Sequence, residues 1–160
     1  MKLEKQIEYH IWAEKNFFTF MEPLNDKQWT EEIPTIGKTL QEIYSHQIEM
    51  LWSWHQYILG KTPKNPPEFE KMSKSEIEKT LIEFLEKLKK YLQENKEKKV
   101  RIVTNWLKNQ YIATNRELIF DGINHLTYHR GQIAMMLKYY GIEVPETDYN
   151  PYMLAKLKVI

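Results

Sequence analysis

The chain of 160 residues contains no cysteine. Disulfide scaffolds, thiolate zinc sites, iron–sulfur clusters and a cysteine nucleophile are therefore excluded, and any metal ion must be held by nitrogen or oxygen atoms. No apolar run approaches the length of a membrane span, and the charged first ten residues do not resemble a signal peptide. The sequence therefore predicts a cytoplasmic protein with no membrane partner.

The chain also lacks an excess of charge of either sign. It has 23 basic and 22 acidic residues, and its formal net charge is +1. A nucleic-acid partner would require a basic surface that neutralises phosphates, so we expect none. The length suits one compact domain, which we expect to span residues 1–160.

Apolar residues recur at helical spacing in four long segments. The first segment begins near residue 3 and is expected to stop near Pro23. Thr39 and Glu42 form a capping-box pair, which predicts that a second long helix begins there and ends before Gly60.

A second capping-box pair, Ser73 and Glu76, precedes a strongly amphipathic segment that is expected to end near Asn95. In residues 100–113, apolar side chains then alternate with polar ones, and the run Lys-Asn-Gln at 108–110 could form a turn. This pattern allows a short hairpin.

The pair Thr114 and Glu117 begins a fourth long helix, expected to run to about Tyr140, and residues 149–157 are expected to form a short helix. Four long helices in one small domain predict an all-α fold. We expect a four-helix bundle with a possible short hairpin before the last long helix and a short C-terminal helix.

Three histidines fall on helix faces that the apolar pattern turns inward. His125 and His129 are four residues apart, so their rings lie on one face, about 6 Å apart along the helix axis. His46 lies midway along the second long helix, within an otherwise apolar stripe. Facing helices of bundles supply such ligands to one metal ion. The pattern is equally compatible with a divalent metal site and with hydrogen-bonded core histidines.

Three polar neighbours could assist these histidines. Asp121 lies one helical turn before the histidine pair, where it could orient an imidazole or be a solvated surface carboxylate. Gln132 lies three residues after the pair and could bind a water on the metal or bridge two helices. Glu49 lies three residues after His46 and could act as a general base or lie on the surface.

Four other residues depart from their local pattern. Glu14 falls in the apolar stripe of the first helix, so its carboxylate either faces the cavity or lies at the edge of the stripe. Arg130 projects away from the two histidines and is expected to contact a carboxylate or a dimer partner. Gly131 costs about 1 kcal/mol of helix stability relative to Ala in a helix interior. The close approach of another helix would explain why a glycine stands there, and Gly122 could mark a second such approach.

The run Asn-His-Leu-Thr-Tyr-His-Arg-Gly-Gln-Ile at 124–133 resembles the signature of the DinB-like superfamily, an Asn-His pair followed three residues later by His-Arg-Gly-Gln. His46, in the run Ser-His-Gln-Ile-Glu, matches the histidine that the family places midway in its second helix. The run Tyr-His-Ile-Trp-Ala at 9–13 resembles the start of the family's first helix. Glu14 stands where the family often has Asn, a departure that bears on substrate-side contacts and leaves the three histidines intact.

The resemblance implies a four-helix bundle, commonly a homodimer, in which His46, His125 and His129 bind zinc, nickel or a similar ion. Some relatives are metal-dependent thiol transferases that use bacillithiol, mycothiol or glutathione, and others have no established activity. Three imidazoles by themselves would also accept copper or iron.

Three neutral nitrogen ligands leave a coordination position open for water or a thiol, as in catalytic zinc sites, and the metal could lower the pKa of that ligand. The leading hypothesis is therefore a metal-dependent transferase or hydrolase that acts on a small molecule, with a low-molecular-weight thiol as cosubstrate. The alternatives are a non-enzymatic metal-binding or stress-response bundle and a structural homodimer without metal.

Overall fold

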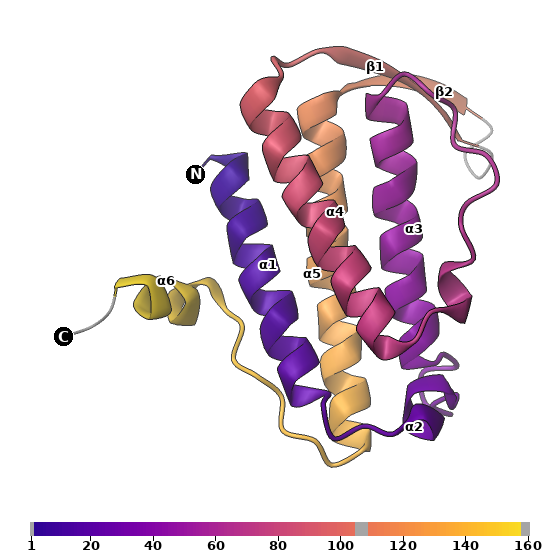
Figure 1. Ribbon diagram of the computed structural model, residues 1–160, viewed down its shortest axis with the longest axis vertical. Coiled ribbons are helices and arrows are strands. Elements are labelled where there is room, and N and C mark those ends of the chain that lie inside the picture. The colour runs from indigo at the N-terminus through magenta and orange to yellow at the C-terminus, as the bar shows by residue number, and fades with distance from the viewer. Residues whose placement is uncertain (1, 105–108, 158–160) are drawn as a thin grey trace.

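Four long helices lie side by side and make up most of the fold (Figure 1). The computed structural model describes residues 2–104 and 109–157 of the chain. The long helices are α1 (Leu3–Phe20), α3 (Leu40–Ile58), α4 (Lys74–Glu94) and α5 (Asn115–Tyr139). The shorter elements are α2 (Asp26–Thr30), the 3₁₀ helix η1 (Phe69–Lys71), the strands β1 (Lys99–Thr104) and β2 (Asn109–Thr114), and α6 (Tyr149–Leu157). The described chain is mostly helical, with one small sheet.

Side-chain caps determine where three of the long helices begin. The hydroxyls of Thr39, Ser73 and Thr114 each accept a hydrogen bond from the backbone N–H three residues later. In each case the side chain of that later glutamate accepts a hydrogen bond from the backbone N–H of the capping residue, which satisfies a second donor. The three predicted starting points are therefore confirmed, whereas α2 and η1 are too short to produce a periodic pattern.

The four long helices pack in the cyclic order α1, α4, α3, α5, each against two of the others. Their apolar faces meet in one core that includes the fully buried side chains of Ile7, Tyr44, Leu51, Leu81 and Ile133. Burial of each of the four aliphatic side chains in this set stabilises the fold by about 1.5–3 kcal/mol. None of the helices described is long and apolar enough to cross a membrane.

The predicted hairpin is confirmed, and it lies across one end of the helices (Figure 1). β1 and β2 are antiparallel, and the side chains of Val100 and Ile102 are buried against the helices. The hydroxyl of Tyr57 in α3 donates a hydrogen bond to the carbonyl of Val103, which ties the hairpin to that helix. Of the predicted turn at 108–110, residue 108 lies outside the described residues and Asn109 and Gln110 belong to β2.

The two glycines of α5 have opposite surroundings. A Cβ atom on Gly122 would lie 2.9 Å from Cδ2 of Leu51, so α3 and α5 approach each other closely at this point. Gly131 is exposed, and no atom of the described residues lies within 4 Å of the position that its Cβ would take. The expected close approach is therefore confirmed at Gly122 and, within this chain, wrong at Gly131.

Candidate metal centre

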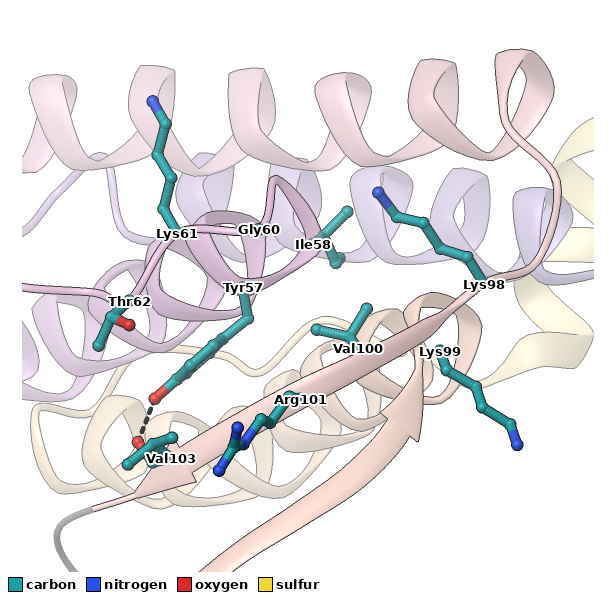
Figure 2. A pocket seen from close by; sticks show the side chains of 10 residues that line it. All are labelled: Tyr57, Ile58, Gly60, Lys61, Thr62, Lys98, Lys99, Val100, Arg101 and Val103. Carbon is teal, nitrogen blue, oxygen red and sulfur yellow. Dashed lines mark hydrogen bonds between the residues drawn. The ribbon is translucent and has the colours of Figure 1, made fainter.

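Two pockets are lined by chemically distinct side chains. The first lies between the end of α3 and β1 (Figure 2). It has a volume of about 410 Å³, and its lining includes the cations Lys61, Lys98, Lys99 and Arg101. Their side chains point in different directions, and the guanidinium of Arg101 donates hydrogen bonds to the side chain of Gln110. The cations therefore do not converge on a common ligand position.

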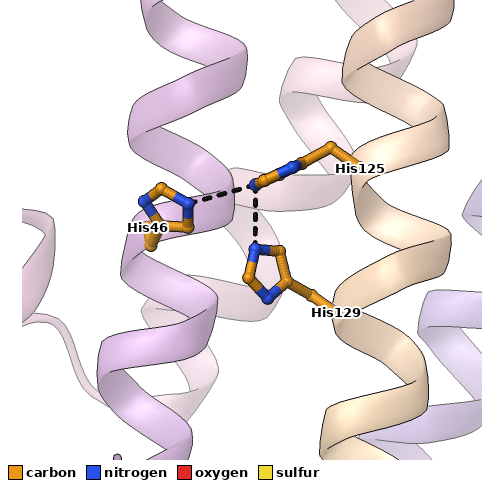
Figure 3. A group of neighbouring side chains, drawn as sticks. All are labelled: His46, His125 and His129. Atoms are coloured by element: carbon orange, nitrogen blue, oxygen red, sulfur yellow. Dashed lines mark hydrogen bonds between the residues drawn. The ribbon is translucent and has the colours of Figure 1, made fainter. Parts of the chain in front are cut away.

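The second pocket is lined in part by His46 of α3 and His129 of α5. The rings of these two histidines and of His125, also in α5, turn toward one another (Figure 3). The Nε2 atom of His125 lies 3.1 Å from Nε2 of His46 and 2.8 Å from Nε2 of His129. One potential ligand atom from each histidine lies within 4.8 Å of the others. Two helices far apart in the sequence thus bring the three predicted residues together.

These nitrogen atoms are arranged as the ligands of a cation would be. Bonds of about 2.0–2.1 Å to a tetrahedral zinc ion place two ligand nitrogens about 3.3 Å apart. The distances from Nε2 of His125 to the other two Nε2 atoms, 3.1 Å and 2.8 Å, are close to this value. A single proton can bridge only one pair of nitrogens, whereas a metal ion can accept all three lone pairs. The cluster could therefore hold a metal ion after small movements of the rings.

Gln132 determines which nitrogen of His129 is free. The Nδ1–H group of His129 donates a hydrogen bond to Oε1 of Gln132 at 2.6 Å, so the lone pair of Nε2 faces the other two rings. The amide nitrogen of Gln132 also donates to the hydroxyl of Tyr128 at 3.3 Å. Gln132 thus orients an imidazole, a role that the sequence spacing does not reveal because it depends on the side-chain conformation.

The protonation of the cluster favours metal binding. Burial, with smaller contributions from His129 and His46, lowers the pKa of His125 to about 4. Burial also lowers the pKa of His129, although its hydrogen bond to Gln132 acts in the opposite direction. Both rings are therefore neutral at pH 7, which is the form of histidine that binds metal ions.

The cluster lies at the edge of the helical core rather than in its interior. His129 is 8% exposed and His125 is half-buried, but His46 is exposed. The prediction that His46 faces inward is therefore wrong, because α3 turns this side chain toward the outer margin of its contact with α5. The adjoining pocket has a volume of about 360 Å³ and is lined by Lys38, Glu42, Ile43, His46, His129 and Gln132. A small molecule can reach the imidazole nitrogens from this side.

Asp121 and Glu49 are not brought to the cluster. The carboxylate of Asp121 is exposed and accepts a hydrogen bond from Nε1 of Trp54 at 3.1 Å, so it links α5 to α3. Glu49 is exposed on α3, and no hydrogen bond joins it to a histidine among the described residues. The structure therefore provides Gln132, and neither of the two carboxylates, as a hydrogen-bonding partner of the cluster.

Arg130 follows His129 directly but turns into the core between α1 and α5. Its Nη1 atom lies 2.9 Å from Oε1 of Glu14 and 3.4 Å from Nδ1 of His10. Burial raises the pKa of Glu14, and the nearby Arg130 opposes that rise. Burial and the charge of Arg130 lower the pKa of His10 to about 3. The expected carboxylate partner of Arg130 is thus the buried side chain of Glu14.

Comparison with known proteins places nearly the whole chain in one family. The family profile described as "DinB family" matches residues 1–157. The chain is also 27% identical over 158 residues to Protein DinB of Bacillus subtilis (strain 168), and the alignment covers 93% of this chain and 92% of that protein. The predicted membership of the DinB-like superfamily is therefore confirmed, and the chain belongs to the DinB family.

Proposed function

We propose that this protein is a four-helix bundle that binds one divalent ion, zinc or nickel, through His46, His125 and His129 and transfers a low-molecular-weight thiol to a small electrophile. The observation that carries the proposal is the convergence of three imidazole Nε2 atoms beside an open pocket. Nitrogen donors of this kind suit zinc and nickel.

The residues of the cluster suit a catalytic ion better than a structural one. Structural zinc sites use four protein ligands, whereas three ligands leave a position for an exchangeable group. A bound ion would supply Lewis acidity and lower the pKa of a water or thiol at its remaining position. Gln132 holds His129 in the tautomer whose Nε2 atom is free, and exposure of His46 leaves one side of the cluster accessible.

The adjoining pocket is of a size that takes a small molecule. Ile43 supplies an apolar wall, and Lys38 and Glu42 supply polar groups at the rim. Because the chain has no cysteine, a sulfur nucleophile must come from a cosubstrate. In the proposed transfer the thiol sulfur bonds to the electrophilic carbon, the leaving group departs with its electron pair, and the thiol proton passes to solvent.

A second candidate function is metal binding without catalysis, in a structural or stress-response role. It is favoured by the absence of a carboxylate in hydrogen-bond contact with the histidines among the described residues. General-base catalysis usually requires such a group within hydrogen-bond reach of the proton that it removes. The two candidates therefore share the metal site and differ in whether a thiol is consumed.

Elemental analysis of protein purified without a tag or chelating column tests the metal site. We expect about one divalent ion per chain in the wild type and less than about a tenth of that in His129→Ala, because two remaining imidazoles bind weakly. His55→Ala is the matched control, since His55 also lies half-buried on α3 but outside the cluster. Equal metal content in the wild type and His129→Ala would exclude the site.

Thiol consumption then separates the two candidate functions. Wild-type protein loaded with zinc or nickel is incubated with glutathione, bacillithiol or mycothiol and with 1-chloro-2,4-dinitrobenzene. Thiol transfer predicts release of chloride about tenfold or more above the rate with His129→Ala for at least one thiol. Full metal occupancy without any acceleration would favour metal binding without catalysis.

A further inference from the structure

Four polar atoms on fully buried side chains of α1 and α3 have no hydrogen-bond partner among the described residues. They are Oε2 of Glu14 in α1, the hydroxyl of Tyr44 in α3, and both Oε1 and Nε2 of Gln47 in α3. Burying a polar group without a hydrogen bond is costly, so folded proteins supply a partner for nearly every such atom. These four atoms therefore require a partner that the chain itself does not provide.

The three side chains meet in one part of the interior. Tyr44 and Gln47 are three residues apart and share the inward face of α3. The ring centres of Tyr44 and Phe18 lie 4.8 Å apart, and Phe18 follows Glu14 by one turn of α1. Burial raises the pKa of Tyr44, and the charge of Glu14 raises it further, which agrees with this proximity. Because α1 runs toward α2 and α3 runs away from it (Figure 1), one turn back along α1 matches one turn forward along α3, so Gln47 lies about level with Glu14.

The contacts of α5 lead to the same level by a second route. The ring centres of His46 in α3 and His129 in α5 lie 5.1 Å apart. Gln47 directly follows His46 in the sequence. Arg130 directly follows His129 and forms the buried ion pair with Glu14. Both routes therefore bring Gln47 and Glu14 to the part of the interior that lies behind the histidine cluster.

The hydrogen-bonding needs of the four atoms identify the class of partner. The carboxylate oxygen of Glu14 and Oε1 of Gln47 each need a donor, whereas the hydroxyl of Tyr44 and Nε2 of Gln47 each have a hydrogen to donate. A water molecule can donate two hydrogen bonds and accept two, and buried waters bind to polar groups of this kind. A metal ion or an ammonium ion accepts no hydrogen bond and would be repelled by Arg130. A small anion would be repelled by the carboxylate of Glu14.

We propose that the interior of the bundle binds an ordered water molecule between Glu14, Tyr44 and Gln47. The water joins α3 to the carboxylate through which α1 is already paired with Arg130 of α5. One hydrogen-bonded network then links the three helices, directly behind the two that carry the histidine cluster. The site requires neither a metal ion nor a thiol, so it stands or falls separately from the proposed function.

Magnetic relaxation dispersion of the water oxygen nucleus tests the proposal, because it counts the water molecules that stay bound for longer than the protein takes to tumble. The full-length protein is measured in EDTA, so that no water on a metal ion contributes. We expect about one such molecule fewer in Gln47→Met than in the wild type, since methionine has a similar length but can neither donate nor accept well. Gln93→Met makes the same chemical change at an exposed position of α4 and should leave the count unchanged. Equal counts in the wild type and Gln47→Met would overturn the proposal.

Tyr44→Phe provides a second variant, for which the sign of the stability change decides. If the hydroxyl of Tyr44 is bonded to the water, its removal should raise the equilibrium constant of unfolding in urea about threefold or more. In a dry interior the same change would remove an unpartnered polar atom and lower that constant. Tyr139→Phe is the matched control, because Tyr139 is 55% exposed on α5, and it should change the constant by less than about twofold. An unchanged or lowered constant in Tyr44→Phe would overturn the proposal.

Discussion

Two polar regions meet at consecutive residues of α5, His129 and Arg130, and they differ in how their polar atoms are satisfied. On the outer side, the histidine nitrogens of the cluster converge on one another beside an open pocket. On the inner side, the guanidinium of Arg130 is paired with the carboxylate of Glu14, and both side chains are almost fully buried. The outer region could therefore hold a ligand from outside, whereas the inner region joins α5 to α1.

Both regions contain a histidine with a strongly lowered pKa, so protonation alone does not distinguish them. The pKa of His10 is lowered to about 3, and that of His125 to about 4, mainly by burial in both cases. The neighbours make the difference. His10 lies against the permanent cation Arg130, which repels a metal ion, whereas His125 lies against two further imidazoles, which can donate lone pairs to one. A buried neutral histidine is therefore a metal ligand only where its surroundings add further lone pairs.

Breaking the inner ion pair should have the largest effect on stability. Glu14→Ala leaves the charge of Arg130 buried without a partner and should lower the free energy of unfolding by about 3–5 kcal/mol. Urea denaturation measures this loss, with the exposed Glu83→Ala on α4 as a control that should change stability by less than about 0.5 kcal/mol. The double variant Glu14→Leu with Arg130→Met should recover most of the stability. A loss below about 1 kcal/mol in Glu14→Ala would mean that the pair does not hold α1 to α5.

The second-largest effect expected is a loss of stability on acidification, caused by protonation of His10 in the unfolded chain. Its pKa is about 3 in the fold, below the value of about 6.5 in an unfolded chain. As the pH falls below about 6.5, the unfolded state therefore binds a proton that the folded state does not. The resulting loss in the free energy of unfolding grows until the pH approaches about 3. Between pH 7 and pH 5 this group should cost about 2 kcal/mol.

Comparison of His10→Gln with the wild type isolates this contribution. Urea unfolding at pH 7 and pH 5 in EDTA should show a smaller acid-induced loss in the variant, because Glu14, Arg130 and the histidine cluster are present in both proteins. The raised pKa of Glu14 acts in the opposite direction at acidic pH and is common to both. Equal losses in the two proteins would show that His10 is already protonated in the fold.

Much of the fold could be predicted from the sequence, because the signals that begin helices act between residues three or four positions apart. The capping boxes at Thr39, Ser73 and Thr114 place the starts of three long helices, since each cap is a contact within one helical turn. For the same reason the pair His125 and His129 could be assigned to one face. That His46 joins them depends on the packing of two helices. Its place in an apolar stripe left a metal site and a hydrogen-bonded core histidine equally open, and the resemblance to the family favoured the metal site.

Other features depend on tertiary packing and could not be predicted. Glu14 and Arg130 lie 116 residues apart, so their pairing follows from the contact of α1 with α5. The exposure of His46 follows from the rotation of α3 about its axis, which the close contact between Leu51 and Gly122 helps to set. A periodicity pattern gives the apolar face of α3 but not the side of that face on which a histidine lies.

A smaller effect is expected when the outer cluster loses its orienting hydrogen bond. Gln132→Leu removes the acceptor that holds Nδ1–H of His129, so the ring should sample orientations that do not point Nε2 at the cluster. Isothermal titration with zinc should show affinity lowered about tenfold, at the low end for partners of this kind because Gln132 is half-buried. Gln93→Leu, an exposed position of α4, should bind zinc like the wild type. Unchanged affinity in Gln132→Leu would show that helix packing alone orients His129.

The smallest effect is expected at Glu49, and it sharpens the contrast between the two regions. Its side chain is exposed, so Glu49→Ala should change zinc affinity and the free energy of unfolding by less than about 0.5 kcal/mol. The rate of thiol transfer should also stay within about twofold of the wild type, because a solvated carboxylate without contact to the histidines cannot receive the thiol proton better than water does. A loss of about 100-fold in that rate with zinc affinity unchanged would instead identify Glu49 as the proton acceptor. The outer region would then contain a general base that moves to the cluster when substrate binds.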